Sequence, residues 1–210
     1  MLETVNSDTA CSGVILAGGL SKRFAGKNKA FLEVGGRRVI DHIFGVFSAV
    51  FEDILIVTNE PTRYMEFDAT IVSDVYPVRS SLTGVHAGLF YARTPFAFVA
   101  ACDIPFLKEE LVRTILQNIE PNTGVVIPET QAGMEPMCAA YAKTCLPVME
   151  RHIQKEKFKI QRIFNSFRVK KVPEAALRRA DPELQSFFNI NTPDDLRQAE
   201  SWNGPGGDSP

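Results

Sequence analysis

Glycine and basic residues that could bind phosphate gather near the start of the chain. Residues 16–24 read LAGGLSKRF, and Lys29 follows six residues after Arg23. The pair Gly18-Gly19 would let backbone N–H groups approach anionic oxygens without a Cβ in the way, and Arg23 and Lys29 would bring charge to β and γ phosphates. The spacing fits neither a Walker A loop nor the Gly-x-Gly-x-x-Gly dinucleotide pattern. A tight strand-to-helix turn with a plain surface lysine is the alternative.

Two aspartates follow apolar runs of the chain. Asp103 comes directly after FAFVAAC, and Asp74 comes after TIVS. Mg²⁺ prefers one or two protein carboxylates together with phosphate oxygens and water, so Asp103 alone could hold it. Aspartate also initiates turns, for instance before Pro105, which leaves a structural role open for both residues. Together with the glycine pair, the two carboxylates favour a nucleotide site.

A small-residue turn precedes a predicted helix in VYPVRSSLTGVHAGL, residues 75–89. Such a turn can present free N–H groups to a base or a phosphate, although Ser81 or Thr83 could simply cap the helix. Neither a Ser-His nor a Cys-His pair with catalytic spacing accompanies it. We interpret the three histidines (His42, His86, His152) as structural or surface residues.

These residues must be positioned by alternating strands and helices. Short apolar runs predict strands at 13–17, 54–58, 97–102, 125–127 and 169–172. Helical periodicity predicts helices at 39–51, 107–119, 144–155 and 160–167 and after an N-cap at Thr192. Continuous apolar strands are typical of sheets buried on both faces, so we expect a Rossmann-like α/β three-layer sandwich with a mostly parallel, mixed central sheet in a single domain. Ligands of such sheets bind beyond the carboxyl ends of the strands, where Gly18, Asn59, Asp74 and Asp103 would meet.

Length, composition and net charge indicate the class of protein. The chain has 210 residues, 45% of them hydrophobic, and a net charge of −2. We expect one globular domain at residues 11–202, a polar tail at 1–10 and a disordered tail at 203–210. The longest apolar run is too short to cross a bilayer and the start lacks the order of a signal peptide, so a cytoplasmic protein without membrane association is expected.

Cysteines and charge distribution exclude some functions. The four cysteines lack a CxxC pair, which predicts reduced, half-buried thiols rather than a zinc site or disulfides (Cys11, Cys102, Cys138, Cys145). Residues 151–179 hold ten of the 23 basic residues, and a solvated surface is favoured there over an anionic ligand. No basic motif interleaved with aromatic residues predicts nucleic acid binding.

Five motifs together resemble a known family. LAGGLSKRF with Lys29, SD at Asp74, SLTGVHAGL, CDIP at Asp103 and FFNINTPDDL are similar, in order and spacing, to the molybdenum cofactor guanylyltransferases, which are GT-A-like nucleotidyltransferases. The resemblance runs from Ser12 to Arg197. It implies an enzyme that binds GTP with Mg²⁺ and transfers GMP to the phosphate of molybdopterin, with release of pyrophosphate.

The resemblance also implies roles for individual residues. Arg23, Lys29 and Asp103 would be catalytic: Arg23 would frame the triphosphate, Lys29 would offset charge on the leaving pyrophosphate, and Asp103 would hold Mg²⁺. The implied nucleotide-binding set is Leu16, Ala17, Gly18, Gly19, Lys29, Asn59, Asp74, Ser81, Leu82, Gly84 and Asp103. The implied acceptor side comprises Glu135, Pro136, Asn189, Asn191 and Thr192.

Three positions depart from the family pattern. Asn28 stands where an aspartate is common, and Ser81 stands where a proline is usual. Val57 occupies a strand-end position where an asparagine is often found, so Thr58 or Asn59 would have to replace that contact.

Three alternatives remain open at this stage. The first is a related cytidylyltransferase, or a transferase acting on another phosphorylated acceptor. The second is a non-catalytic nucleotide-binding or cofactor-delivery module that docks a partner through residues 151–179. A dinucleotide oxidoreductase is the least favoured, because the glycine pattern is wrong. Expected partners are GTP and molybdopterin, with molybdoenzymes or cofactor-handling proteins as further candidates.

Overall fold

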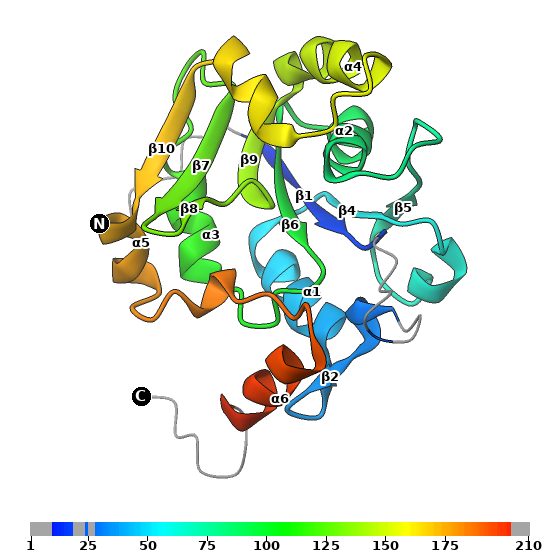
Figure 1. Ribbon diagram of the computed structural model, residues 1–210, viewed down its shortest axis with the longest axis vertical. Helices are drawn as coiled ribbons and strands as arrows, with labels where there is room; N and C mark the ends of the chain where they lie inside the picture. The colour runs from blue at the N-terminus through cyan, green and yellow to red at the C-terminus, as the bar shows by residue number, and fades with distance from the viewer. Residues whose placement is uncertain (1–9, 19–23, 25–27, 203–210) are drawn as a thin grey trace.

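The computed structural model describes residues 10–18, 24 and 28–202 (Figure 1). The predicted tails, apart from Ala10, lie outside the described residues, as do Gly19 and Arg23. The strands are β1 Cys11–Leu16, β2 Glu33–Val34, β3 Arg37–Arg38, β4 Ile54–Val57, β5 Thr70–Val72, β6 Phe96–Ala101, β7 Val125–Thr130, β8 Gly133–Met134, β9 Cys138–Ala142 and β10 Val169–Pro173. The α-helices are α1 Val39–Val50, α2 Ser81–Tyr91, α3 Glu109–Leu116, α4 Leu146–Gln154, α5 Glu174–Ala180 and α6 Pro193–Trp202. The 3₁₀ helices are η2 Lys29–Phe31, η3 Pro61–Tyr64, η4 Lys143–Cys145, η5 Ile160–Ser166 and η6 Gln185–Phe187.

The central sheet is mixed and mostly parallel, as the sequence predicts. Within the described residues its strand order is β10-β7-β9-β6-β1-β4-β5, with β8 paired to β7. β1 pairs in parallel with both β4 and β6, so the carboxyl ends of three neighbouring strands meet at one edge. β9 runs antiparallel to β6 and β7. The strands β2 and β3 form a separate hairpin.

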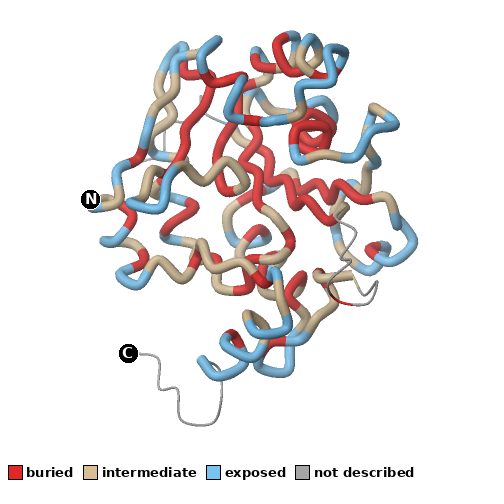
Figure 2. Tube along the Cα trace, viewed as in Figure 1, coloured by how far each residue is buried: buried red, intermediate tan, exposed pale blue. Residues whose placement is uncertain are grey.

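The sheet separates two hydrophobic cores because successive side chains of a strand point to opposite faces. In β1, Ile15 packs with α1 and α3 on one face, whereas Val14 and Leu16 pack with α2 and α4 on the other. Figure 1 shows α2 and α4 together on one side of the sheet and α1 on the other. The central strands are the most deeply buried part of the chain (Figure 2). These layers confirm the predicted three-layer sandwich.

Several local predictions need correction. Residues 160–166 form the 3₁₀ helix η5 instead of the α-helix predicted at 160–167. Ile160, Ile163 and Phe164 are all buried, and either kind of helix can bury residues at this spacing, so the pattern does not distinguish the two. The helix predicted at 107–119 is shorter in the structure, where α3 spans Glu109–Leu116. Leu107, which we expected to begin it, is packed into the core before the helix starts. Three of the four cysteines are buried rather than half-buried, and all four are free thiols.

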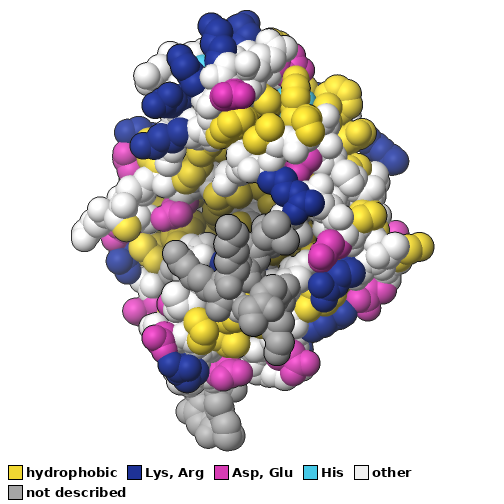
Figure 3. Space-filling model, turned by 45° about the vertical axis from the view of Figure 1, so that its right-hand side comes forward, with side chains coloured by type: hydrophobic (Ala, Val, Ile, Leu, Met, Phe, Trp, Pro, Cys, Tyr) yellow, Lys and Arg dark blue, Asp and Glu magenta, His cyan; other side chains and the backbone are white. Residues whose placement is uncertain are grey.

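Charge and hydropathy follow the expected pattern. The basic side chains of residues 151–179 are mostly exposed, and Figure 3 shows basic groups gathered at the end of the molecule that carries α4. None of the described helices combines the length and the apolar character needed to cross a membrane.

Glycine 88 is required for the contact between α2 and β1. A Cβ on Gly88 would lie 2.4 Å from Val14 Cγ1, whereas a Cβ on the exposed Gly45 of α1 would meet nothing closer than Arg37 Nη2 at 3.8 Å. We therefore expect Gly88→Ala to destabilise the fold by about 1–3 kcal/mol through overpacking. Gly45→Ala should stabilise it by up to about 1 kcal/mol, since alanine is the better helix former. Urea unfolding measures both, and equal effects would contradict this packing.

Candidate functional site

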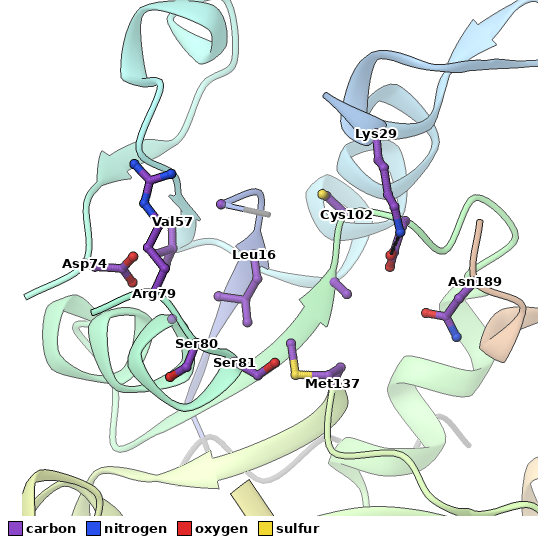
Figure 4. Close-up of a pocket in the computed structure, with 14 residues that line it drawn as sticks. Leu16, Lys29, Val57, Asp74, Arg79, Ser80, Ser81, Cys102, Met137 and Asn189 are labelled. Carbon is purple, nitrogen blue, oxygen red and sulfur yellow. Dashed lines mark hydrogen bonds and ion pairs between the residues drawn. The ribbon is translucent and has the colours of Figure 1, made fainter. Parts of the chain in front are cut away.

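A cavity of about 540 Å³ opens at the carboxyl ends of β1, β4 and β6. This is the edge at which the parallel-sheet rule places ligands. Its lining combines apolar strand ends with polar side chains from distant segments (Figure 4). The lining residues are Leu16, Gly18, Lys29, Val57, Asp74, Arg79, Ser80, Ser81, Gly84, Ala101, Cys102, Asp103, Met137 and Asn189.

Lys29 joins three segments of the chain at one end of the cavity. Its Nζ lies 3.1 Å from Asp103 Oδ2 and 2.7 Å from Asn191 Oδ1. The backbone N–H of Ile190 donates to the carbonyl of Asp103 over 2.9 Å, which holds the C-terminal segment against the end of β6. The side chains of Lys29 and Asp103 are only 20% and 19% exposed, so solvent screens this ion pair less than it would a surface pair.

One oxygen of the Asp103 carboxylate lacks a hydrogen-bond partner among the described residues. This atom, Oδ1, is buried. Carboxylate oxygen is a hard ligand that suits Mg²⁺ or Ca²⁺. The described residues contain no group of three or more His, Cys, Asp or Glu that could hold a metal. Asp103 therefore fits a cation that draws its remaining ligands from phosphate oxygens and water.

Asp74 and Arg79 lie across the cavity from Lys29 and Asn189 (Figure 4). Asn59 Nδ2 donates to Asp74 Oδ2 over 3.1 Å and fixes the orientation of this carboxylate. The amide at this end of the sheet thus comes from Asn59, two residues beyond Val57. The side chain of Val57 lines the cavity without polar groups. Arg79 brings a second cation to the cavity; no role is predicted for it from the sequence.

Helix α2 begins at the cavity wall with a capping box in which Thr83, one of the two residues expected to cap it, takes part and Ser81, the other, does not. Ser80, and not Ser81, is the N-cap: Ser80 Oγ accepts from Thr83 N over 3.1 Å, and Thr83 Oγ1 accepts from Ser80 N over 2.9 Å. Ser81 and Gly84 line the cavity, whereas Leu82 points into the core and is fully buried. The cap occupies the Ser80 hydroxyl and leaves Ser81 facing the cavity.

The predicted acceptor-side residues separate into two groups. Asn189 lines the cavity and Asn191 reaches Lys29, while Thr192 caps α6 by accepting from Asp195 N over 3.2 Å. Glu135 and Pro136 lie between β8 and β9 and are not among the lining residues; Met137, which follows them, is. Partial burial raises the pKa of the Glu135 carboxyl.

Comparison with known proteins places this architecture in a family. Residues 13–172 match the family described as "MobA-like NTP transferase domain". The chain belongs to this family. Membership makes it a nucleotidyltransferase, confirms the resemblance found in the motifs, and suggests use of a divalent metal ion.

Similar proteins carry consistent names. A "Molybdenum cofactor guanylyltransferase" of Desulfosudis oleivorans is 45% identical over 192 residues, which cover 91% of this chain and 95% of the relative. A "Probable molybdenum cofactor guanylyltransferase" of Natranaerobius thermophilus is 35% identical over 198 residues, covering 92% and 96%. Among solved structures, molybdopterin-guanine dinucleotide biosynthesis protein A from Archaeoglobus fulgidus superposes with a TM-score of 0.80 at 29% identity, covering 90% of this chain and 97% of that one.

Asn28, one of the positions that depart from the resemblance described above, uses both the oxygen and the nitrogen of its side-chain amide. Its Oδ1 accepts from Ala30 N over 3.0 Å and caps η2. Its Nδ2 donates to Tyr64 Oη and to Glu60 Oε2, both over 3.0 Å. The buried Tyr64 hydroxyl in turn donates to the carbonyl of Ala17 over 3.4 Å, at the start of the predicted phosphate loop. An aspartate would keep the cap and lose both donated bonds.

The hydrogen bond from Asn28 is the largest influence that holds the pKa of Glu60 below its usual range. A group with a depressed pKa stabilises the fold above its unfolded pKa and loses that contribution as pH falls through the folded value. In Asn28→Asp the two carboxylates repel instead. We expect a loss of about 1 kcal/mol near pH 7 that shrinks as pH falls and one carboxyl is protonated. Urea unfolding at pH 7 and pH 4.5 checks this; equal stability losses at both values would contradict it.

Proposed function

We propose that the protein is a Mg²⁺-dependent molybdenum cofactor guanylyltransferase. It transfers GMP from GTP to the phosphate of molybdopterin and releases pyrophosphate. The observation that carries the proposal is the meeting of Lys29, Asp103 and Asn191, which joins the glycine-loop, CDIP and NINTP motifs at one end of the cavity. The names of the relatives from Desulfosudis oleivorans and Archaeoglobus fulgidus support the choice of nucleotide and acceptor.

The nucleotide occupies the wall formed by β1, β4 and the start of α2. We assign its contacts to the backbone of residues 16–18, to the Asn59–Asp74 pair, and to Ser81 and Gly84, with Leu82 supporting the wall from the core. N–H groups at a helix start favour anionic or carbonyl oxygens, which suits a purine nucleotide at α2. Gly19 and Arg23 complete the triphosphate side in this proposal.

The phosphate end of the site is assigned to Lys29 and Asp103. The free, buried Oδ1 of Asp103 is the protein oxygen that would hold Mg²⁺. When bound, Mg²⁺ neutralises charge on the phosphates and orients them. Lys29 is a point charge that can turn from Asp103 to the leaving pyrophosphate as negative charge develops there.

The transfer needs no general base. The acceptor is a phosphate whose oxygen is already ionised at neutral pH, so a bond forms from this oxygen to the α phosphorus while the bond to pyrophosphate breaks. Catalysis then rests on positioning and charge neutralisation. We assign binding of the acceptor to Asn189 and Asn191, and Thr192 fixes the start of α6 beside them. Glu135 and Pro136 belong to the same side but lie farther from the cavity. Consistently, His86 is buried beneath α4, and burial lowers its pKa, which favours the neutral ring.

The proposed function also implies a cellular location and recipients for the product. We place the enzyme in the cytoplasm, and we consider molybdoenzymes or cofactor-handling proteins as recipients of the product. A related cytidylyltransferase is the nearest alternative, and a non-catalytic delivery module is the second. Neither has a specific contact in the cavity that favours it.

A nucleotide panel separates these alternatives. Pyrophosphate release should be seen with GTP and molybdopterin, require Mg²⁺, and fall at least about tenfold when CTP or ATP replaces GTP. Faster release with CTP would support the cytidylyltransferase. GTP binding without release for any phosphorylated acceptor would support the delivery module and contradict the proposal.

Lys29 should act on chemistry more than on binding. In Lys29→Ala we expect kcat to fall about 10²-fold to 10³-fold, because charge on the leaving group is no longer offset, while the Kd of GTP rises less than about tenfold. The exposed Lys155 provides the matched control, and Lys155→Ala should keep the wild-type rate. A variant of Lys29 that weakens GTP binding as much as turnover would refute the assigned role.

A further inference from the structure

A buried polar network lies below the acceptor side of the cavity and has no part in the chemistry above. Asp181 has no exposed surface, and its carboxylate is held by two partners. Ser186 N donates to Asp181 Oδ2 over 2.7 Å. Lys108 Nζ lies 3.0 Å from Oδ1, as an ion pair that lacks the alignment of a hydrogen bond. Burying a carboxylate lowers the stability of the fold unless the carboxylate is paired. The network therefore favours the one arrangement of the surrounding chain that keeps its partners in place.

The network ties the C-terminal segment to the chain that follows β6. The side chain of Ser186, also fully buried, lies with its Oγ 3.1 Å from Lys108 N and 3.3 Å from the carbonyl of Phe106. Four residues later Ile190 N reaches the carbonyl of Asp103. Two attachments thus fix residues 186–190 along the same short connection, residues 103–108, that begins with Asp103.

The backbone between Asp181 and Ser186 is held in an unfavourable conformation at Leu184. Leu184 has φ 54° and ψ 30°, in the left-handed region that side chains other than glycine, asparagine and aspartate seldom adopt. Leu184 N donates to the carbonyl of Asp181, and Phe187 N donates to the carbonyl of Leu184. A leucine persists there only when surrounding contacts enforce it. The Asp181 carboxylate and the Ser186 hydroxyl supply those contacts.

We infer that Asp181 and Ser186 are positioning residues for the acceptor side of the site. They fix residues 187–192 against Asp103, so that Asn189 faces the cavity and Asn191 meets Lys29, without touching substrate themselves. The inference rests on the proposed function for the identity of the acceptor. That the network sets the position of residues 187–192 does not depend on the proposed function.

The sole tryptophan of the chain reports on this segment. The Trp202 ring lies 4.8 Å from the Phe188 ring and 5.3 Å from the Phe106 ring, measured between centroids. These two phenylalanines belong to the two pieces of chain that Ser186 joins. Displacement of the segment therefore changes the environment of Trp202 whether or not turnover is measured.

The test compares Ser186→Ala with Ser12→Ala. Ser12 is equally buried and its hydroxyl donates to Asp53 over 2.6 Å, but it lies at the amino end of β1, away from the cavity. We expect both variants to lower Tm. Only Ser186→Ala should shift Trp202 emission and its quenching by acrylamide, and only Ser186→Ala should lower kcat/KM for molybdopterin, by about tenfold or more, with the Kd of GTP unchanged. Ser186→Cys, which keeps the shape and a weak donor, should restore part of the loss.

A double-mutant cycle tests most directly whether Ser186 acts through Asn191. If Ser186 acts through the segment, the losses from Ser186→Ala and Asn191→Ala will not multiply, because each disables the same contact. Multiplying losses, or emission and kinetics in Ser186→Ala that match those of Ser12→Ala, would overturn the inference. Absence of acceptor-dependent pyrophosphate release in the wild-type protein would refute the proposed function instead, and the Trp202 comparison would still decide whether the network places the segment.

Discussion

The contact between Lys29 and Asp103 is the interaction on which the rest of the site depends. A lysine from a short 3₁₀ helix meets a carboxylate at the end of a central strand, and Asn191 from the far end of the chain completes the group. The pair is largely buried, so water weakens the electrostatic interactions of its two charges less than it would at the surface. The carboxylate can therefore attract a cation and the ammonium group can attract an anion. A cation can join Asp103 and a phosphate can join Lys29, which is the combination that a bound metal–nucleotide complex presents.

The fold serves this contact by bringing strand ends together and by letting helices approach closely. The parallel pairing of β1 with β6 sets Cys102 N 3.0 Å from the carbonyl of Leu16, so the cavity wall at the end of β1 is continuous with the Asp103 end. Gly88 allows α2 to rest on Val14, which brings the start of α2 to the cavity. The reversed strand β9 begins at the same edge and carries Met137 to it.

Sequence reasoning predicted the features that follow from local pattern. Asn59 and Asp103 were placed correctly because a residue directly after a buried parallel strand must lie at the sheet edge, and the Thr192 cap followed from its Pro and Asp neighbours. Of the two residues expected to cap α2, Thr83 takes part in the capping box and Ser81 does not. Ser80 is the N-cap instead, because Ser80 and Ser81 carry the same hydroxyl and only the exact start of the helix distinguishes them. The Lys29–Asn191 contact spans 162 residues and has no local signal, although the family resemblance put both residues in one site. The Asp181 and Ser186 network was missed entirely, since neither residue stands in a recognisable motif.

The central claim is that Asp103 holds the metal that accompanies GTP, and equilibrium binding tests it most directly. The affinity of the wild-type protein for GTP should rise at least about tenfold when Mg²⁺ is added, because Asp103 would hold the cation and the cation would offset the charge of the phosphates. In Asp103→Asn that dependence on Mg²⁺ should be lost, while the affinity for GTP without metal stays the same or improves. A wild-type affinity that ignores Mg²⁺, or an Asp103→Asn variant that retains the full dependence, would contradict the account.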